Sequence, residues 1–81
     1  MTPKITFGYT LWDRETGKIL KYGQTTNPKG RYSEGFYNKH SARMHMETSG
    51  TKKEMVQWEK HKIEEFLIMK GHLPELNKTN R

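Results

Sequence analysis

A single long amphipathic helix, predicted over residues 51–71, places the strongest constraint on how this chain folds. Thr51 and Glu54 form a capping-box pattern at its start, and Gly71 followed by Pro74 is typical of its end. At about 100° per residue, its large apolar side chains fall within an arc of roughly 180°. That arc contains Met55, Val56, Trp58, Ile63, Phe66, Leu67 and Met69. The rest of the chain must therefore supply a layer that covers this face.

Glu59 is a carboxylate near the middle of that apolar arc. A charged group on a core-facing stripe is costly unless a cation meets it. Three explanations stay open for Glu59: a metal ligand, an ion pair with Arg31 or Arg43 within the domain, or a poorly covered helix face. Glu64 and Glu65 point away from the arc, so we expect them to be ordinary solvated acids.

Size and charge narrow the class of protein. With 81 residues, of which 31% are hydrophobic, we expect one domain spanning 1–81 with a small core. The absence of cysteine excludes disulfides and thiolate zinc sites, which fits a cytoplasmic place of action. No apolar run approaches the length of a membrane span, so we expect no membrane partner. The net charge of +6 favours a polyanionic partner, most simply nucleic acid.

The remaining segments predict an α+β domain, with a small three-stranded antiparallel sheet flanked by helices. The predicted order is a strand at 4–12, a turn at 13–17, a strand at 18–24, a short helix within 31–41, a strand at 42–48 and a turn at 49–50. The first two strands would form a β-hairpin. Tyr32, Phe36 and Tyr37 would form the inner face of the short helix, which Gly35 weakens.

Several polar residues are of the kinds that cut a phosphodiester bond. Tyr9 lies on the first predicted strand, Lys21 with Tyr22 on the second, and Arg31 follows the Pro/Gly loop. A carboxylate such as Glu59 can hold a hard divalent cation, and a guanidinium can grip a phosphate through two hydrogen bonds. A tyrosine or lysine can position or deprotonate water. Each also has an ordinary explanation, because strand tyrosines often pack and surface cations are often solvated.

The order of these residues resembles that of the GIY-YIG nuclease family, over essentially the whole chain. The matching positions are Phe7-Gly8-Tyr9 for the first tripeptide, Lys21-Tyr22-Gly23-Gln24-Thr25 for the second with its polar pair, Arg31 for the arginine, Trp58-Glu59 for the helix glutamate and Leu76-Asn77 for the terminal asparagine. Two departures stand out. Lys21 occupies the place of the second tyrosine, and Gly35 the place of a histidine, for which His40 is a loose substitute.

The resemblance implies a nuclease with a three-stranded sheet and one divalent metal, Mg²⁺ or Mn²⁺, bound by Glu59. Arg31 would grip the phosphate, Tyr9 aided by Lys21 would activate water, and Asn77 would orient a side chain or the substrate. DNA is favoured over RNA as the substrate by the habit of the family.

The context of such a small catalytic module is a separate question. We favour a toxin or effector nuclease domain, which would have an immunity or inhibitor protein as partner, over a fragment of a mobile-element nuclease. The rival from another class is a non-catalytic nucleic-acid-binding module, in which Arg31, Lys21 and the tyrosines contact the backbone and bases.

Overall fold

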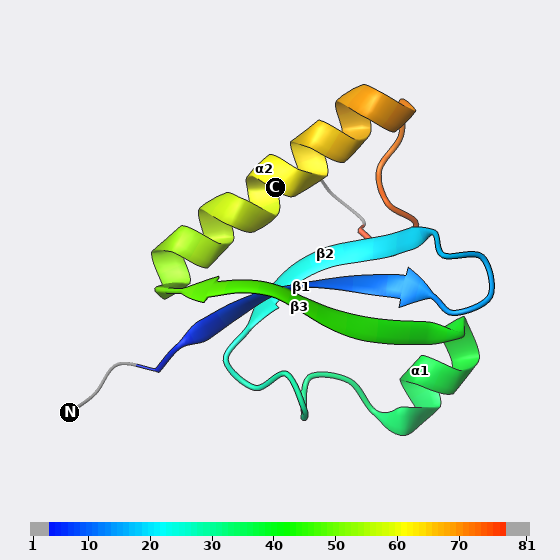
Figure 1. Ribbon diagram of the computed structural model, residues 1–81, viewed down its shortest axis with the longest axis horizontal. Coiled ribbons are helices and arrows are strands. Elements are labelled where there is room, and N and C mark those ends of the chain that lie inside the picture. The colour runs from blue at the N-terminus through cyan, green and yellow to red at the C-terminus, as the bar shows by residue number, and fades with distance from the viewer. Residues whose placement is uncertain (1–3, 78–81) are drawn as a thin grey trace.

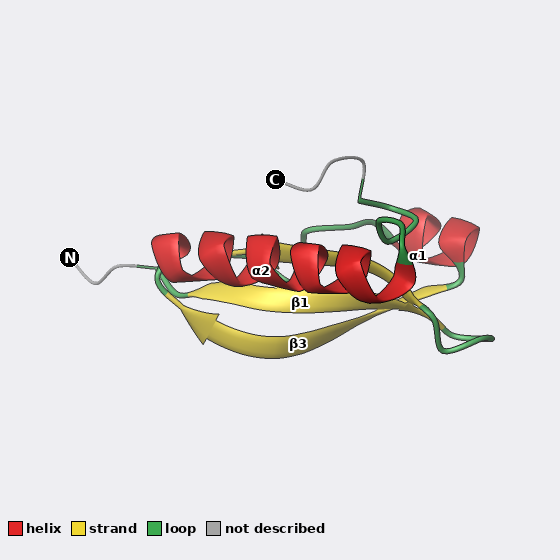
Figure 2. Cartoon of the chain, turned by 90° about the horizontal axis from the view of Figure 1, so that it is seen from above, coloured by secondary structure: helices red, strands yellow, loops and turns green. Residues whose placement is uncertain are grey.

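The computed structural model describes residues 4–77, and the predicted α+β class is confirmed. The elements are β1 (Thr6–Asp13), β2 (Ile19–Thr25), α1 (Glu34–His40), β3 (Ala42–Gly50) and α2 (Lys52–Lys70). The strands form one antiparallel sheet in the order β2-β1-β3, so β1 is central (Figure 1). The strands lie between α2 and α1 in Figure 1, and α2 runs along the strands (Figure 2).

The long helix begins and ends where its capping residues predict. The Thr51 side chain accepts a hydrogen bond from the backbone N–H of Glu54, and the Glu54 carboxylate accepts one from the N–H of Thr51. At the other end, Gly71 adopts the left-handed conformation and its N–H donates to the Leu67 carbonyl. These bonds satisfy backbone groups that the helix itself leaves without partners.

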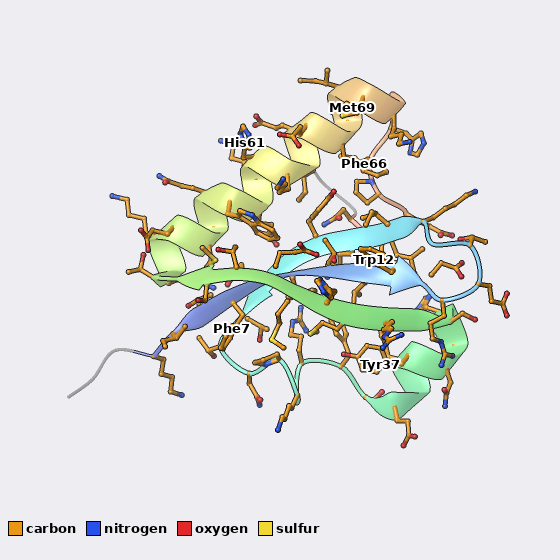
Figure 3. The ribbon with its side chains drawn as sticks, in the orientation of Figure 1. Phe7, Trp12, Tyr37, His61, Phe66 and Met69 are labelled. Carbon is orange, nitrogen blue, oxygen red and sulfur yellow. The ribbon has the colours of Figure 1, made fainter. Side chains whose placement is uncertain are left out.

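The buried face of α2 is narrower than the predicted arc. Met55 and Ile63 are buried against the sheet, but Val56 is 42% and Met69 77% exposed, so their assignment to the core was wrong. Val56 lies at the margin of the arc. Met69 lies in the last turn, at the end of α2 farther from the sheet (Figure 3). A three-stranded sheet covers a narrow stripe of a helix this long.

The two faces of the sheet carry different layers. Gly8 on β1 lies under the Trp58 ring, where a Cβ would collide with it, so α2 packs closely on this face. The opposite face carries Tyr9, Leu11 and their neighbours, covered by α1 and the loop before it. The cluster on that face contains Tyr9, Leu11, Leu20 and Ala42, with Tyr32, Phe36, Tyr37, Met44 and Leu76 packed against it.

Strand ends differ slightly from those predicted. The turn expected at residues 49–50 is wrong, because β3 continues to Gly50, where Ser49 and Gly50 still pair with Phe7 and Thr6 of β1. The short helix predicted within 31–41 is present as α1. Its first turn is capped by the Ser33 side chain, which accepts from the N–H of Phe36. Among the described residues, neither helix is long and apolar enough to cross a membrane.

Candidate active site

Tyr9 is the buried centre of the candidate site. It lies on the central strand, is 1% exposed, and its hydroxyl lies over Gly23 of β2. A side chain at position 23 would occupy the place of the phenol, so the glycine is what allows the ring to reach across to β2. The Tyr9 and Tyr32 hydroxyls are 2.6 Å apart and share a hydrogen bond in which either can donate.

Lys21 and Arg31 meet at Tyr32. Lys21 pairs with Leu11 across the strands, on the same face as Tyr9, and its Nζ donates to the Tyr32 hydroxyl oxygen over 3.0 Å. The Arg31 guanidinium lies over the Tyr32 ring, with its Cζ 4.7 Å from the ring centroid. The structure therefore brings together three residues that the sequence singled out, Tyr9, Lys21 and Arg31, around a fourth that it did not.

Tyr32 was predicted only as a packing residue. It does pack, since its ring stacks on Phe36 with centroids 4.3 Å apart. Its hydroxyl nevertheless bonds both Tyr9 and Lys21. The available sequence signal was its position directly after Arg31, which is weak because loop residues follow no periodicity that reveals their neighbours.

Burial, hydrogen bonding and nearby charges all affect the pKa of Tyr9. Burial holds the pKa of Tyr9 well above its usual value, and the hydrogen bond with Tyr32 raises it further. Arg31 lowers the pKa of Tyr9, and Glu59 makes the smallest of the contributions that raise it. Glu59 is half-buried on α2, between the buried residues Met55 and Ile63 of the same row. Arg31 and Glu59 therefore have opposite effects on the pKa of Tyr9.

Tyr22 lies on the opposite face from Tyr9. Its ring contacts Trp58 and Phe66 of α2 edge-on, with centroids 6.1 and 6.3 Å away (Figure 3 shows Phe66 between α2 and β2). Burial raises its pKa, with smaller contributions from Glu65 and Glu47. Neighbouring strand residues point to opposite faces, so Lys21 and Tyr22 cannot both face Tyr9. Here Lys21 does.

Asn77 holds the backbone of β2. Its Oδ1 accepts from the N–H of Tyr22 over 2.9 Å, and its Nδ2 donates to the Tyr22 carbonyl over 3.1 Å. The N–H of Leu76 also donates to the Leu20 carbonyl. The strand that carries Lys21 and Gly23 is therefore fixed on its outer edge by the C-terminal segment, and Asn77 acts on the site through that strand.

His40 contacts the cluster through one intervening ring. It ends α1 and packs on Phe36 with centroids 4.6 Å apart, and Phe36 in turn stacks on Tyr32.

A separate groove of ≈ 780 Å³ lies at the hairpin end of β2, where Lys18, Leu20, Phe66 and Lys70 contribute to its walls. Tyr9, Lys21, Arg31 and Tyr32 are not among the residues that line this groove.

The protein contributes few metal-ligating groups around the site. Within residues 4–77, no group of three or more His, Asp or Glu side chains is close enough to hold a metal ion among themselves. Mg²⁺ in phosphoryl-transfer sites is usually bound through one or two carboxylates, water and substrate phosphates. Glu59, a half-buried carboxylate on α2, could supply one ligand in such a sparse coordination.

Comparison with known proteins gives no relative: no protein-family model, no curated protein and no solved structure matches this chain.

Proposed function

We propose that the chain is a divalent-metal-dependent endonuclease of the GIY-YIG type that hydrolyses phosphodiester bonds. The observation that carries the proposal is the convergence of Tyr9, Lys21 and Arg31 at one cluster. These three residues come from β1, β2 and the loop before α1. Sequence order alone supplies the resemblance to the family, and the spatial convergence is independent support for it.

Each side chain has a role that suits its surroundings. Arg31 is exposed and planar, so it can bind two oxygens of the scissile phosphate. Lys21 adds a second cation, which donates a hydrogen bond to the Tyr32 hydroxyl. Glu59 would hold Mg²⁺ or Mn²⁺, which would offset the charge on the phosphate and assist the leaving oxygen. Asn77 keeps β2 in register, and His40 supports the ring stack behind Tyr32.

The substrate and context are part of the proposal. A net charge of +6 suits a nucleic acid, and we favour DNA over RNA. We also propose that the module acts in the cytoplasm as a toxin or effector nuclease domain. A cognate immunity protein would then carry an acidic surface complementary to this basic domain.

A non-catalytic nucleic-acid-binding module is the second candidate. The observation that favours it is Trp12, which is 41% exposed and lies 5.9 Å from the His45 ring, centroid to centroid. Exposed aromatic rings in a basic protein are suited to stacking on unpaired bases.

The experiment compares Glu59→Gln with Glu64→Gln, an exposed glutamate on the same helix that undergoes the same loss of charge. Plasmid DNA and tRNA are incubated with each protein in Mg²⁺, Mn²⁺ or EDTA. We expect metal-dependent cleavage that Glu59→Gln reduces about 100-fold or more, the loss of about 3 kcal/mol of transition-state stabilisation. Glu64→Gln should cleave as the wild type does. Binding without cleavage in either metal would overturn the nuclease and favour the binding module.

A further inference from the structure

Tyr32 and Tyr9 differ in their access to a reacting water. A general base must come within hydrogen-bond reach of the proton that it removes. Tyr9 is 1% exposed and its hydroxyl lies between Gly23 and the Tyr32 hydroxyl. Tyr32 is only half-buried. Of the two tyrosines that share the 2.6 Å bond, Tyr32 is therefore the more exposed residue.

The cations of the cluster also gather on Tyr32. A lysine ammonium can only donate, so the Tyr32 oxygen must accept the hydrogen bond from Lys21. Hydrogen bonds donated to an oxygen stabilise its charged form. The guanidinium of Arg31 lies over the face of the same ring, and the Lys21 Nζ is 5.5 Å from the ring centroid. Two positive charges therefore lie in contact with this one phenol.

The contacts of Tyr32 indicate which of the two tyrosines donates the proton in their shared hydrogen bond. A Tyr32 phenolate has further acceptor capacity beyond the bond from Lys21, and the Tyr9 O–H is the donor that fills it. Burial keeps the pKa of Tyr9 high, so Tyr9 stays protonated and remains a donor. Other titratable groups near the cluster are Tyr37, whose ring lies edge-on to Tyr32, His40 behind Phe36, and Glu59, which acts on Tyr9.

We propose that Tyr32, held by Lys21 and Arg31, is the general base of this site, and that Tyr9 is a positioning residue that donates to it. The inference rests on the proposed nuclease function. In the step, the Tyr32 oxygen takes a proton from water while the water oxygen forms a bond to phosphorus. The bond from phosphorus to the leaving oxygen breaks, and that oxygen takes a proton from solvent.

The order in which the tyrosines ionise can be measured without substrate or metal. The protein has four tyrosines, which can be labelled with ¹³C at Cζ, assigned by single Tyr→Phe variants and titrated by NMR. We expect Tyr9 to ionise at the highest pH of the four, because burial and the hydrogen bond with Tyr32 raise its pKa.

Ionisation of Tyr9 before the other tyrosines would overturn the inference, because Tyr9 would then not remain a donor. Since this readout does not depend on cleavage, its failure is distinct from failure of the nuclease function. If the titration behaves as expected but no nucleic acid is cut in Mg²⁺ or Mn²⁺, the nuclease proposal fails and the base role falls with it.

Cleavage kinetics supply the second arm. Tyr32→Phe should lower kcat about 100-fold or more and abolish the rise of kcat with pH. Tyr9→Phe should lower kcat less and shift that rise to higher pH, because the phenolate loses a hydrogen-bond donor. The reverse pattern, in which Tyr9→Phe abolishes the rise and Tyr32→Phe only shifts it, would return the base role to Tyr9.

Discussion

The hydroxyl of Tyr9 lies over the α-carbon of Gly23, in the space that any side chain at position 23 would fill. The two residues are directly paired across β1 and β2, so the phenol lies along the surface of its neighbouring strand instead of standing away from the sheet. This placement brings the Tyr9 hydroxyl to Tyr32 and keeps it out of solvent. The small residue on β2 thus determines where the buried phenol ends.

Gly23→Ala should disrupt this placement. The added methyl group would collide with the Tyr9 ring and hydroxyl, so the ring must move and the bond to Tyr32 must break. We expect the free energy of unfolding to fall by about 1–3 kcal/mol, the usual cost of overpacking. Urea unfolding checks this, with Gly35→Ala as the matched control. Gly35 lies in α1, where an added Cβ would meet only the Ser33 hydroxyl at an ordinary van der Waals distance, so the same change there should stabilise by about 0.5–1 kcal/mol. A Gly23→Ala protein as stable as wild type would contradict the close packing.

Arg31→Lys should weaken cleavage while the fold is kept. Lysine retains the charge but loses the planar, two-pronged donor and the stacking on Tyr32. We expect kcat/KM to fall about 10- to 100-fold, as for the loss of a charge-assisted hydrogen bond of about 1.5–3 kcal/mol. Arg43→Lys, the same change on the exposed side of β3, is the control and should leave kcat/KM near the wild-type value. Equal losses in the two variants would mean that only general charge matters.

Asn77→Ala should destabilise the protein, because Asn77 is a buried polar residue. The change removes both hydrogen bonds to the Tyr22 backbone and leaves those groups partly buried. The expected loss is about 1–3 kcal/mol in the free energy of unfolding. Asn38→Ala, an exposed asparagine in α1, should change stability by less than about 0.5 kcal/mol. If Asn77→Ala abolishes cleavage without loss of stability, Asn77 acts on the substrate directly and not through β2.

Stability should fall at alkaline pH because of Tyr9. Its pKa is raised on folding by burial, so its contribution to stability is complete below the ordinary tyrosine pKa of 10.0 and is lost as the pH rises above that value. The slope can reach about 1.4 kcal/mol per pH unit for one group. Urea unfolding from pH 8 to 11 should show a shallower decline for Tyr9→Phe than for wild type. Tyr22 and Tyr37, whose pKa values burial also raises, are present in both proteins and cancel in the comparison. Parallel declines would mean that Tyr9 ionises freely in the folded state.

The fold could be predicted from the sequence where local rules act. The capping residues Thr51, Glu54 and Gly71 give the bounds of α2 because they bond to nearby backbone groups. Periodicity placed Glu59 on the row between Met55 and Ile63, and both of these neighbours are buried. The extent of the buried stripe depends on the width of the sheet, which no local pattern contains, and that is why Val56 and Met69 were misplaced.

The candidate site was predictable only in part. Strand alternation could have separated Lys21 from Tyr22, because adjacent strand residues face opposite ways. The contact of Tyr32 with Lys21 could not be derived, because it depends on how the loop after β2 folds back over the sheet. The hydrogen bonds between Asn77 and Tyr22 join residues 55 positions apart, and this pairing likewise follows only from the tertiary arrangement.

The contact between the C-terminal segment and β2 has a consequence for self-association. β2 is an edge strand, and exposed edge strands can pair with strands of other molecules. Leu76 and Asn77 occupy the outward-facing backbone groups of Leu20 and Tyr22, so a second chain would have to displace them before it could extend the sheet there. The segment that keeps Lys21 and Gly23 in place therefore also protects the protein against strand-to-strand aggregation at that edge.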